Sequence, residues 1–198
     1  MPRLDRDDLE GDPIAQFAVW WDDAGDVPLR DSMTLATVDD ESQPDARMVL
    51  LKGFGDDGFR FFTNYESAKA GQLDASGHAA LILYWRELDR QVRIRGSVER
   101  LGSDASDEYF ATRRRDSQLG AWASPQSRPL TDRAELDSRL AEAEKRFGEG
   151  DVERPPHWGG FLVRHEVVEF WQGQVGRLHD RFTYTREGDG WTIERLGP

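Results

Sequence analysis

The sequence contains no cysteine among its 198 residues. Disulfide bonds, thiolate metal ligands and cysteine nucleophiles are therefore excluded together. No apolar run approaches the roughly 20 residues with which a helix crosses a bilayer. Residues 1–8 are acidic and lack the apolar core of a signal peptide. These absences predict a cytoplasmic protein that makes no contact with a membrane.

Positive charge is also scarce, because 26 lysines and arginines face 38 aspartates and glutamates, and the net charge is −12. General nucleic-acid and membrane-surface binding are disfavoured, since both need a basic footprint. Local groups of cations become more informative against this background. Arg113, Arg114 and Arg115 form one group, and Arg177 with Arg181 form another. A solvated helix end is the alternative interpretation of the first group.

Several motifs of catalysis are missing. The histidines are His78, His157, His165 and His179, and no pair of them has the spacing of metal ligands on a helix. The sequence has no GxSxG nucleophile elbow, no GxxxxGK[ST] phosphate loop and no GxGxxG turn. We therefore expect no metal site, no serine hydrolase and no Rossmann-type dinucleotide site.

The apolar pattern predicts a mainly β (α+β) fold in one domain spanning residues 1–198. Expected strands cover residues 33–38, 47–52, 59–64, 79–84, 90–101, 161–171, 182–184 and 191–196. Expected helices cover residues 13–23, 67–73, 104–112, 117–123 and 131–147, the first of them capped by Asp12. Residues 1–11 are expected to be mobile, and the apolar strand 47–52 to be buried on both faces. Hairpins without regular βαβ alternation indicate a small β-barrel with flanking helices.

Side chains that suit phosphate lie on or beside these strands: Arg47, Lys52, Thr63, Ser67, Lys69, Gln91, Tyr109, Arg113, Ser117, Gln126 and Ser127. Each of them alone is more often a surface residue than a ligand. Arg47 and Lys52 are an odd number of residues apart, so a regular strand directs them to opposite faces. They serve one ligand only across a bulge, or else they serve two different ligands.

Residues 170–181 combine aromatic and cationic groups in a glycine-rich turn. Trp171 offers a flat apolar wall, Arg177 and Arg181 can fork onto phosphate or carboxylate, and His179 can donate or accept a proton near neutral pH. This set suits a planar anionic ligand. A solvated hairpin with incidental charge is the alternative. Pairing with a neighbouring arginine is the expected use of Asp180.

An ordered set of segments from about residue 33 to the C-terminus resembles the pyridoxine (pyridoxamine) 5′-phosphate oxidase family. The segments are RMVLLK (47–52), FTN (62–64), SAK (67–69), ELDRQV (87–92), RDSQLGAW (115–122), WGGF (158–161), EFWQG (169–173) and RLHDR (177–181). The resemblance implies an FMN-binding split β-barrel that works as a homodimer with FMN at the interface. Residues 157–198 would complete the active site.

The resemblance also assigns roles to residues. The implied FMN contacts are Arg47, Met48, Val49, Leu50, Leu51, Lys52, Phe62, Thr63, Lys69, Gln91, Gln126, Ser127, Trp171 and Arg181. The implied substrate contacts are Lys52, Tyr109, Arg113, Ser117, Arg177 and His179, of which Arg177 and His179 are the expected catalytic residues. Arg47 would then hold the FMN phosphate and Lys52 the substrate phosphate, which accounts for their opposite faces.

The implied reaction is oxidation of pyridoxamine or pyridoxine 5′-phosphate to pyridoxal 5′-phosphate, with O₂ reduced to H₂O₂. Two other functions remain open: a split-barrel flavoenzyme with another substrate such as a phenazine precursor, and a non-catalytic module that binds FMN or pyridoxal phosphate. The chain departs from the family pattern in three places. Ala68 replaces an arginine that contacts the FMN phosphate in many relatives, Arg114 replaces a proline, and the loop at residues 28–32 differs.

Overall fold

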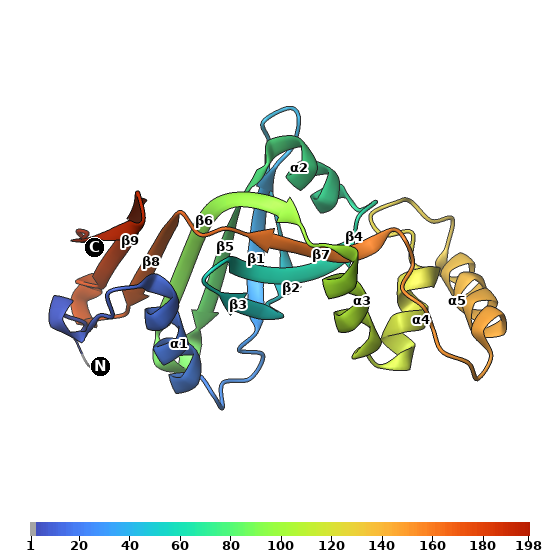
Figure 1. The fold of residues 1–198 in the computed structure, drawn as a ribbon, viewed down its shortest axis with the longest axis horizontal. Helices are drawn as coiled ribbons and strands as arrows, with labels where there is room; N and C mark the ends of the chain where they lie inside the picture. Colours follow the sequence, from blue (N-terminus) through green and yellow to red (C-terminus); the bar gives the residue numbers. More distant parts are fainter. Residues whose placement is uncertain (1–2) are drawn as a thin grey trace.

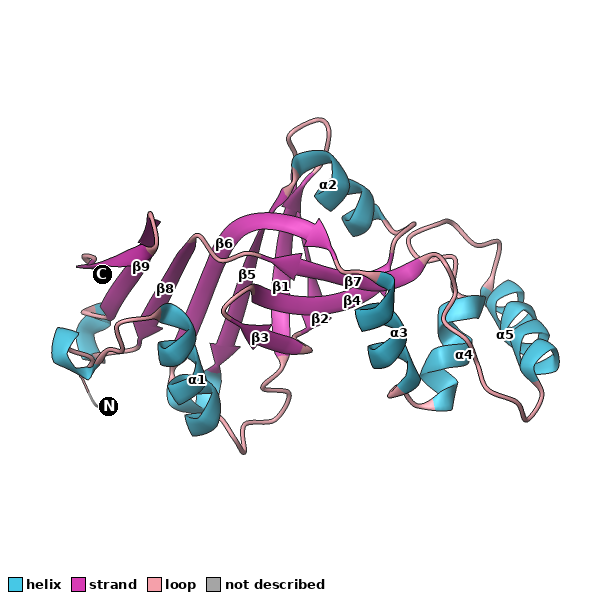
Figure 2. Cartoon of the chain, viewed as in Figure 1, coloured by secondary structure: helices cyan, strands magenta, loops and turns pink. Residues whose placement is uncertain are grey.

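The computed structural model describes residues 3–198 as one curled antiparallel sheet with helices at its edges (Figures 1 and 2). The main path of the sheet has the order β10-β9-β8-β6-β5-β1-β2, and β3, β4 and β7 lie off this path. The strands are β1 (Ser32–Val38), β2 (Pro44–Leu50), β3 (Gly53–Gly55), β4 (Gly58–Asn64), β5 (His78–Trp85), β6 (Arg90–Arg100), β7 (Trp158–Val163), β8 (Val167–Gln172), β9 (Asp180–Glu187) and β10 (Gly190–Arg195). The helices are α1 (Pro13–Asp23), α2 (Ala68–Ser76), α3 (Ser103–Ala111), α4 (Arg115–Ala123) and α5 (Arg133–Phe147).

Strand β6 produces the curl, because its two ends pair with different neighbours. Residues 90–95 of β6 pair with β8, and residues 98–100 pair with β7. Gly96 lies at the change of partner, where an added Cβ would meet the Arg164 carbonyl oxygen at 1.7 Å. Strand β7 then pairs with β4, so the sheet folds back on itself as a half-barrel. The predicted split barrel with flanking helices is confirmed.

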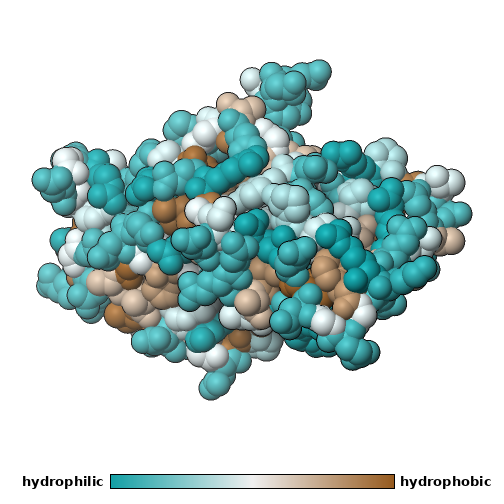
Figure 3. All heavy atoms as spheres, turned by 45° about the vertical axis from the view of Figure 1, so that its right-hand side comes forward, coloured by the Kyte–Doolittle hydropathy of each residue, from teal (hydrophilic) through white to brown (hydrophobic). Residues whose placement is uncertain are grey.

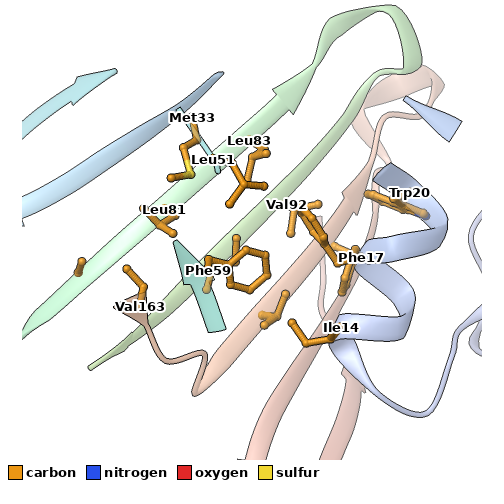
Figure 4. Packing of buried hydrophobic residues seen from close by; sticks show 14 of the residues in the cluster. Ile14, Phe17, Trp20, Met33, Leu51, Phe59, Leu81, Leu83, Val92 and Val163 are labelled. Atoms are coloured by element: carbon orange, nitrogen blue, oxygen red, sulfur yellow. The ribbon is translucent and has the colours of Figure 1, made fainter. Parts of the chain in front are cut away.

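The main core lies between the sheet and α1 (Figure 4). Asp12 caps this helix as predicted, since its carboxylate accepts the backbone N–H of Ile14 at 2.7 Å. Phe17 makes an edge contact with Phe59 at 4.9 Å between ring centroids. Burying a side chain such as Phe17 stabilises the fold by roughly 1.5–3 kcal/mol. Trp20 contacts Phe170 of β8 at 5.1 Å and Phe17 contacts Phe54 of β3 at 4.7 Å, so the helix joins β8 to β3 and β4.

A smaller apolar cluster holds α3, α4 and α5 at the end of the molecule away from β8 and β9 (Figure 1). Phe110 of α3 and Leu119 of α4 pack here with Trp158, the first residue of β7. Because Trp158 belongs to the sheet, this contact fixes the helices beside β4. Helix α5 buries only Ala143, as expected for the predicted surface helix.

The N-terminal segment differs from the expectation that residues 1–11 are mobile. Leu4 and Leu9 are buried, and a 3₁₀ turn spans Arg6–Asp8. The backbone N–H of Leu4 donates to Asp180 at 3.1 Å, and Arg195 donates to the Leu4 carbonyl at 3.0 Å. The expectation is wrong for residues 3–11, because two isolated leucines and these hydrogen bonds attach a polar segment. Residues 1 and 2 lie outside the described residues.

Strand β2 is not buried on both faces, so that prediction is wrong. The strand ends the main path of the sheet, and Met48 is 62% exposed while Leu50 is 44% exposed. The sequence of a continuously apolar strand is the same whether its second face packs in the core of the chain or is exposed on the single chain. The single chain therefore leaves the apolar residues Met48 and Leu50 of β2 exposed.

The expected single strand at residues 161–171 is two strands, β7 and β8. The polar residues 164–166 form the corner between them and wrap around Gly96 of β6. Arg164 donates its backbone N–H to the Ser97 carbonyl at 2.8 Å, and Glu166 donates to the Arg95 carbonyl at 2.9 Å. This corner and the short β3 raise the strand number from about eight to the ten that the described residues form. The other expected elements are confirmed, with shifted ends.

Candidate active site

A cavity of about 250 Å³ lies among β2, β4, α2 and α3. Every residue that lines it belongs to the predicted FMN or substrate set. The lining residues are Met48, Val49, Leu50, Lys52, Phe62, Thr63, Lys69, Tyr109, Arg113 and Gln126. Segments that are up to 78 residues apart in the sequence, from Met48 to Gln126, therefore meet at one place in the fold.

Lys69 gives this cavity a partly buried cation. Helix α2 places its Nζ 2.7 Å from Gln126 Oε1, 3.2 Å from Ser67 Oγ and 3.3 Å from Thr63 Oγ1. All three partners are neutral. Burial lowers the pKa of Lys69, and the charge of nearby Arg47 lowers it further. A desolvated cation with neutral partners favours the approach of an anion.

Arg47 belongs to β2 and lies near Lys69. Its side chain points toward β1 and α2. Its Nη1 donates to Thr37 Oγ1 at 2.5 Å, and its Nη2 donates to Gln72 Oε1 at 2.9 Å. The same Nη2 forms an ion pair with the carboxylate of Asp45, two residues earlier on β2. Two positive charges are thus held together with one negative charge, and the balance of this group is cationic.

Arg113 contributes a second cationic position. Its guanidinium lies over the Trp158 ring, with Cζ 4.7 Å from the ring centroid. Its Nη1 is buried and has no hydrogen-bond partner among the described residues. Burial lowers the pKa of Arg113 from its usual value. A buried N–H donor without an acceptor costs stability, which is the expected state of a group that receives its acceptor from a ligand.

The other predicted substrate contacts of this region lie close to Arg113. Tyr109 stacks on Phe62 at 4.1 Å between ring centroids, which fixes one wall of the cavity. Ser117, on the first turn of α4, lines a hollow next to Arg113. Lys52 follows β2 and pairs with Asp31 at 2.7 Å. Arg47 and Lys52 therefore have different surroundings, although β2 ends at Leu50 and the alternation of a regular strand does not extend to Lys52.

The remaining predicted FMN contacts lie in three places. Gln91, Trp171 and Arg181 form a row across β6, β8 and β9, because Gln91 pairs with Trp171 and Trp171 pairs with Arg181. Arg181 Nε donates to the buried Glu169 at 2.9 Å. Ser127 follows Gln126 with φ 67°, a left-handed conformation. Leu51 is buried in the main core, so its side chain serves packing.

The two expected catalytic residues lie at the turn between β8 and β9. His179 packs against Trp171 at 4.6 Å between ring centroids, and its Nδ1 accepts the backbone N–H of Gln174 at 3.1 Å. A neutral His179 ring therefore carries its proton on Nε2. Arg177 is exposed in the 3₁₀ turn Val175–Arg177, with φ 63°. His179 therefore lies beside an aromatic ring, and Arg177 adds a cation two residues earlier in the same turn.

One chain does not bring the two groups of site residues together. β9 is five strands away from β2 in the order of the sheet. With strands about 4.8 Å apart, the path along the sheet is roughly 24 Å. In Figure 1, β8 and β9 lie at one end of the ribbon, and β2, β4 and α3, whose residues line the cavity, lie nearer its middle. The structure therefore presents two half-sites, a cavity half with Lys69 and Arg113 and a turn half with Trp171 and His179.

Some residues of the site were not predicted. Gln72 and Asp45 contact Arg47, Trp158 supports Arg113, and Asp31 pairs with Lys52. The strand register carries a signal for Asp45, because Thr37 lies directly opposite it and both contact Arg47. No local signal in the sequence indicates the approach of Gln72, since helix α2 brings it from outside the sheet.

Cavity size alone does not locate the site. A hollow of about 470 Å³ between β1, β5, β6 and β8 is larger and mainly apolar, and none of the predicted site residues lines it. The described residues contain no group of histidine and acidic side chains that could hold a metal ion. Among the same residues, no helix is long and apolar enough to span a membrane.

Comparisons with known proteins identify a family. Residues 26–147 match the family described as pyridoxamine 5′-phosphate oxidase, and residues 158–198 match the region described as the pyridoxine 5′-phosphate oxidase C-terminal dimerisation region. A pyridoxine/pyridoxamine 5′-phosphate oxidase of Salinibacter ruber is 52% identical, over 98% of this chain and 93% of the relative. One from Bordetella pertussis is 53% identical, over 94% and 89%.

Solved structures show the same fold. The crystal structure of PhzG from Burkholderia lata, in complex with tetrahydrophenazine-1-carboxylic acid, has a TM-score of 0.91 at 30% identity and covers 97% of this chain and 95% of its own. A pyridoxamine 5′-phosphate oxidase-related, FMN-binding protein of Nostoc punctiforme has a TM-score of 0.76 at 19% identity, over 96% of this chain and all of its own. The second likeness concerns the fold alone. Together with the full-length relatives, the family matches show that this chain belongs to the pyridoxamine 5′-phosphate oxidase family.

Proposed function

We propose that the chain is an FMN-dependent oxidase of pyridoxamine and pyridoxine 5′-phosphate that produces pyridoxal 5′-phosphate. The amine substrate would give ammonia and the alcohol would not, and O₂ would be reduced to H₂O₂ in both cases. The observation that carries the proposal is the buried Nη1 of Arg113, which has no acceptor in the part of the chain that the structure describes, while Arg113 lines the same cavity as Lys69. The identity of about 50% to relatives that are named for this reaction supports it.

The cavity half suits two phosphate groups rather than one. Arg47 and Lys69 form one cationic position, with Thr63 and Gln126 as neutral supports. Arg113 provides a second position, and it lines the same cavity as Lys52. The first position would hold the FMN phosphate and the second the substrate phosphate. Charge-assisted hydrogen bonds of this kind contribute about 1.5–3 kcal/mol each.

The donor set also fits a flavin. Residues 48–50 line the cavity, and Phe62 and Tyr109 supply stacked rings beside them. Gln91 and Trp171 would complete the contacts from the turn half. When it is bound, FMN supplies the two-electron chemistry and passes the electrons to O₂.

The residues of the chain would act mainly by orientation. Lys52, Tyr109, Arg113 and Ser117 would clamp the substrate phosphate and fix the pyridine ring, and such positioning accounts for a large part of a rate enhancement. Arg177 would contact the substrate beside the reacting carbon. Because Nδ1 of His179 accepts a backbone N–H, Nε2 is the atom that can exchange a proton with the substrate amine or alcohol.

A homodimer would join the two half-sites. The exposed apolar residues Met48 and Leu50 lie at the cavity half, and the exposed Val175 and Leu178 lie at the turn half. Figure 3 shows apolar patches between the hydrophilic residues of one face. A second copy that covers both regions would place its turn half over the cavity of the first. This arrangement is supported by the similarity of residues 158–198 to the C-terminal dimerisation region of the family.

An anaerobic titration of the purified protein with each phosphorylated vitamer tests the proposal. The flavin absorbance should bleach on addition of pyridoxamine or pyridoxine 5′-phosphate, and O₂ should restore it with release of peroxide. Colourless protein that stays inactive with added FMN would refute the proposal. Tetrahydrophenazine carboxylic acids serve as the comparison, because PhzG shares the fold. Turnover of these compounds alone would favour the phenazine alternative, and flavin binding without any reduction would favour the non-catalytic module.

A further inference from the structure

The guanidinium group of Arg47 is almost fully occupied by acceptors of its own chain. Nη1 donates to Thr37 Oγ1 at 2.5 Å and to the Leu35 carbonyl at 3.5 Å. Nη2 donates to Gln72 Oε1 at 2.9 Å and to the Asp45 carboxylate. A guanidinium has five N–H groups, so only the Nε–H remains without an acceptor among the described residues. Arginine holds phosphate best through two parallel N–H bonds. An arriving phosphate must therefore displace one of these acceptors.

The acceptors differ in how easily they can leave. Thr37 is buried, with 3% of its surface exposed, and the Leu35 carbonyl belongs to β1. Gln72 is fixed by a second bond, because Thr37 Oγ1 donates to its Oε1 at 2.6 Å. The Asp45 side chain is 49% exposed and can rotate into solvent. Asp45 is also the acceptor that carries a charge of the same sign as phosphate.

Asp45 is held in place by both Gln72 and Arg47. Gln72 Nε2 donates to its Oδ2 at 3.2 Å, while the Nη2 of Arg47 contacts the same oxygen. The hydrogen bond from Gln72 and the charge of Arg47 lower the pKa of Asp45 below its usual value of 3.8. The carboxylate is therefore ionised at any pH at which flavin binding is measured. Among residues 3–198, Lys69 has only neutral hydrogen-bond partners and forms no ion pair of this kind.

We propose that Asp45 is an internal competitor of the cofactor phosphate for Arg47, and that it sets the affinity of the chain for FMN. The inference rests on the proposed function, in which Arg47 receives the FMN phosphate. When FMN binds, Asp45 must give up its ion pair with Arg47 and become solvated. The displaced carboxylate then stays close to a phosphate that carries up to two negative charges. Both effects weaken binding of FMN. Neither acts on riboflavin, which has the same ring system and no phosphate.

The test compares Asp45→Asn with wild type after the flavin has been removed. Asparagine keeps the size of the side chain and removes its charge. Two unit charges about 4 Å apart in water interact enough to change an equilibrium constant about fivefold. A phosphate dianion doubles the interaction energy, and the greater distance of the displaced carboxylate reduces it. We expect the Kd for FMN, measured by quenching of flavin fluorescence, to fall about tenfold, with a weaker gain at high salt.

Two controls make the result specific. Asp40→Asn removes the same charge from the exposed turn between β1 and β2, where no described contact joins Asp40 to Arg47. It should leave the Kd for FMN unchanged. Riboflavin, titrated into every protein, should bind equally to all of them. Asp45→Ala serves as a second variant, and it should also bind FMN more tightly than wild type.

The outcomes separate the inference from the proposed function. Tighter FMN binding with unchanged riboflavin binding supports the competitor role. Unchanged or weaker FMN binding in both Asp45 variants overturns it, and weaker binding would show that Asp45 positions Arg47 for phosphate. An equal gain for riboflavin, or in Asp40→Asn, overturns it as well, because the phosphate or the position would then not matter. If wild type and variants all fail to bind FMN, the proposed cofactor is itself wrong and the inference falls with it.

Discussion

Replacing Arg113 by methionine should stabilise the free protein and damage substrate binding at the same time. In the structure, Nη1 of Arg113 is buried without an acceptor, and such a group costs about 1–3 kcal/mol. Methionine removes this cost and keeps an unbranched side chain over the Trp158 ring. The cation–π contact at 4.7 Å is lost, which offsets about 0.5–1 kcal/mol. The net expectation is a gain of up to about 2 kcal/mol in the free energy of unfolding.

For a chain of this size, each kcal/mol shifts Tm by about 2–4 °C. Calorimetry of Arg113→Met without substrate, at equal FMN saturation, should therefore show a Tm up to about 4–8 °C above wild type. The same variant loses a charge-assisted bond to the substrate phosphate, so kcat/KM should fall by roughly 10- to 150-fold.

The neighbouring residue offers a matched control. The Arg114 side chain is 85% exposed and pairs with Asp116 at 2.8 Å. Exposed ion pairs contribute about 0–1 kcal/mol, so Arg114→Met should change neither Tm nor kcat/KM appreciably. A lower Tm for Arg113→Met together with unchanged kcat/KM would refute the reasoning, because Arg113 would then be a structural residue with partners of its own.

Three further predictions concern the curl, a buried histidine and the turn half. Gly96→Ala should lower the free energy of unfolding, measured by chemical denaturation, by about 3 kcal/mol or more, because the new Cβ meets the backbone of Arg164. Gly71→Ala is the control: its Cβ enters open space on α2, so the free energy of unfolding should rise by about 0.5–1 kcal/mol. Burial and the charge of nearby Arg186 lower the pKa of His165 below 6.5, so the unfolded chain binds more protons at this residue than the folded chain does. The free energy of unfolding should therefore fall as the pH drops below about 6.5. His165→Phe should make the free energy of unfolding depend less on pH. Arg177→Ala should reduce turnover with little loss of FMN and Arg181→Ala should do the reverse, as measured by kinetics and bound-flavin absorbance; equal flavin loss in both would contradict this division.

The sequence predicts the elements of this fold well because most of them show their periodicity locally. The strand at Arg90–Arg100 alternates as expected, with Val92 and Ile94 buried and Arg95 exposed. The cap of the first helix, at Asp12, is likewise a local signal. The corner at residues 164–166 was missed because its cause lies in β6, where Gly96 admits the backbone of Arg164. Contacts that are distant in the sequence leave no mark on the periodicity of either segment.

The site shows a similar division. Residue types and motif order identify the cavity half, and the ten residues that line the cavity all belong to the predicted set. The internal partners of these residues could not be predicted, because they depend on register and on helix placement. Asp45 lies beside Arg47 through the pleat of β2, while Gln72 arrives from α2. The roles of Arg177 and His179 stay predictions, because one chain holds them roughly 24 Å along the sheet from the cavity.

The pairing of charges explains why the cavity attracts an anion in a protein of net charge −12. Most arginines of the described chain form ion pairs with carboxylates, and those on the surface contribute little to stability. Of the partly buried cations, Arg30, Lys69 and Arg113 have no carboxylate partner among the described residues. Arg30 is satisfied by the Trp21 carbonyl and ring. Lys69 and Arg113 remain, and both line the same cavity. Because a buried cation without a counter-ion is costly, their joint presence at one place is best explained by ligands that supply the negative charge.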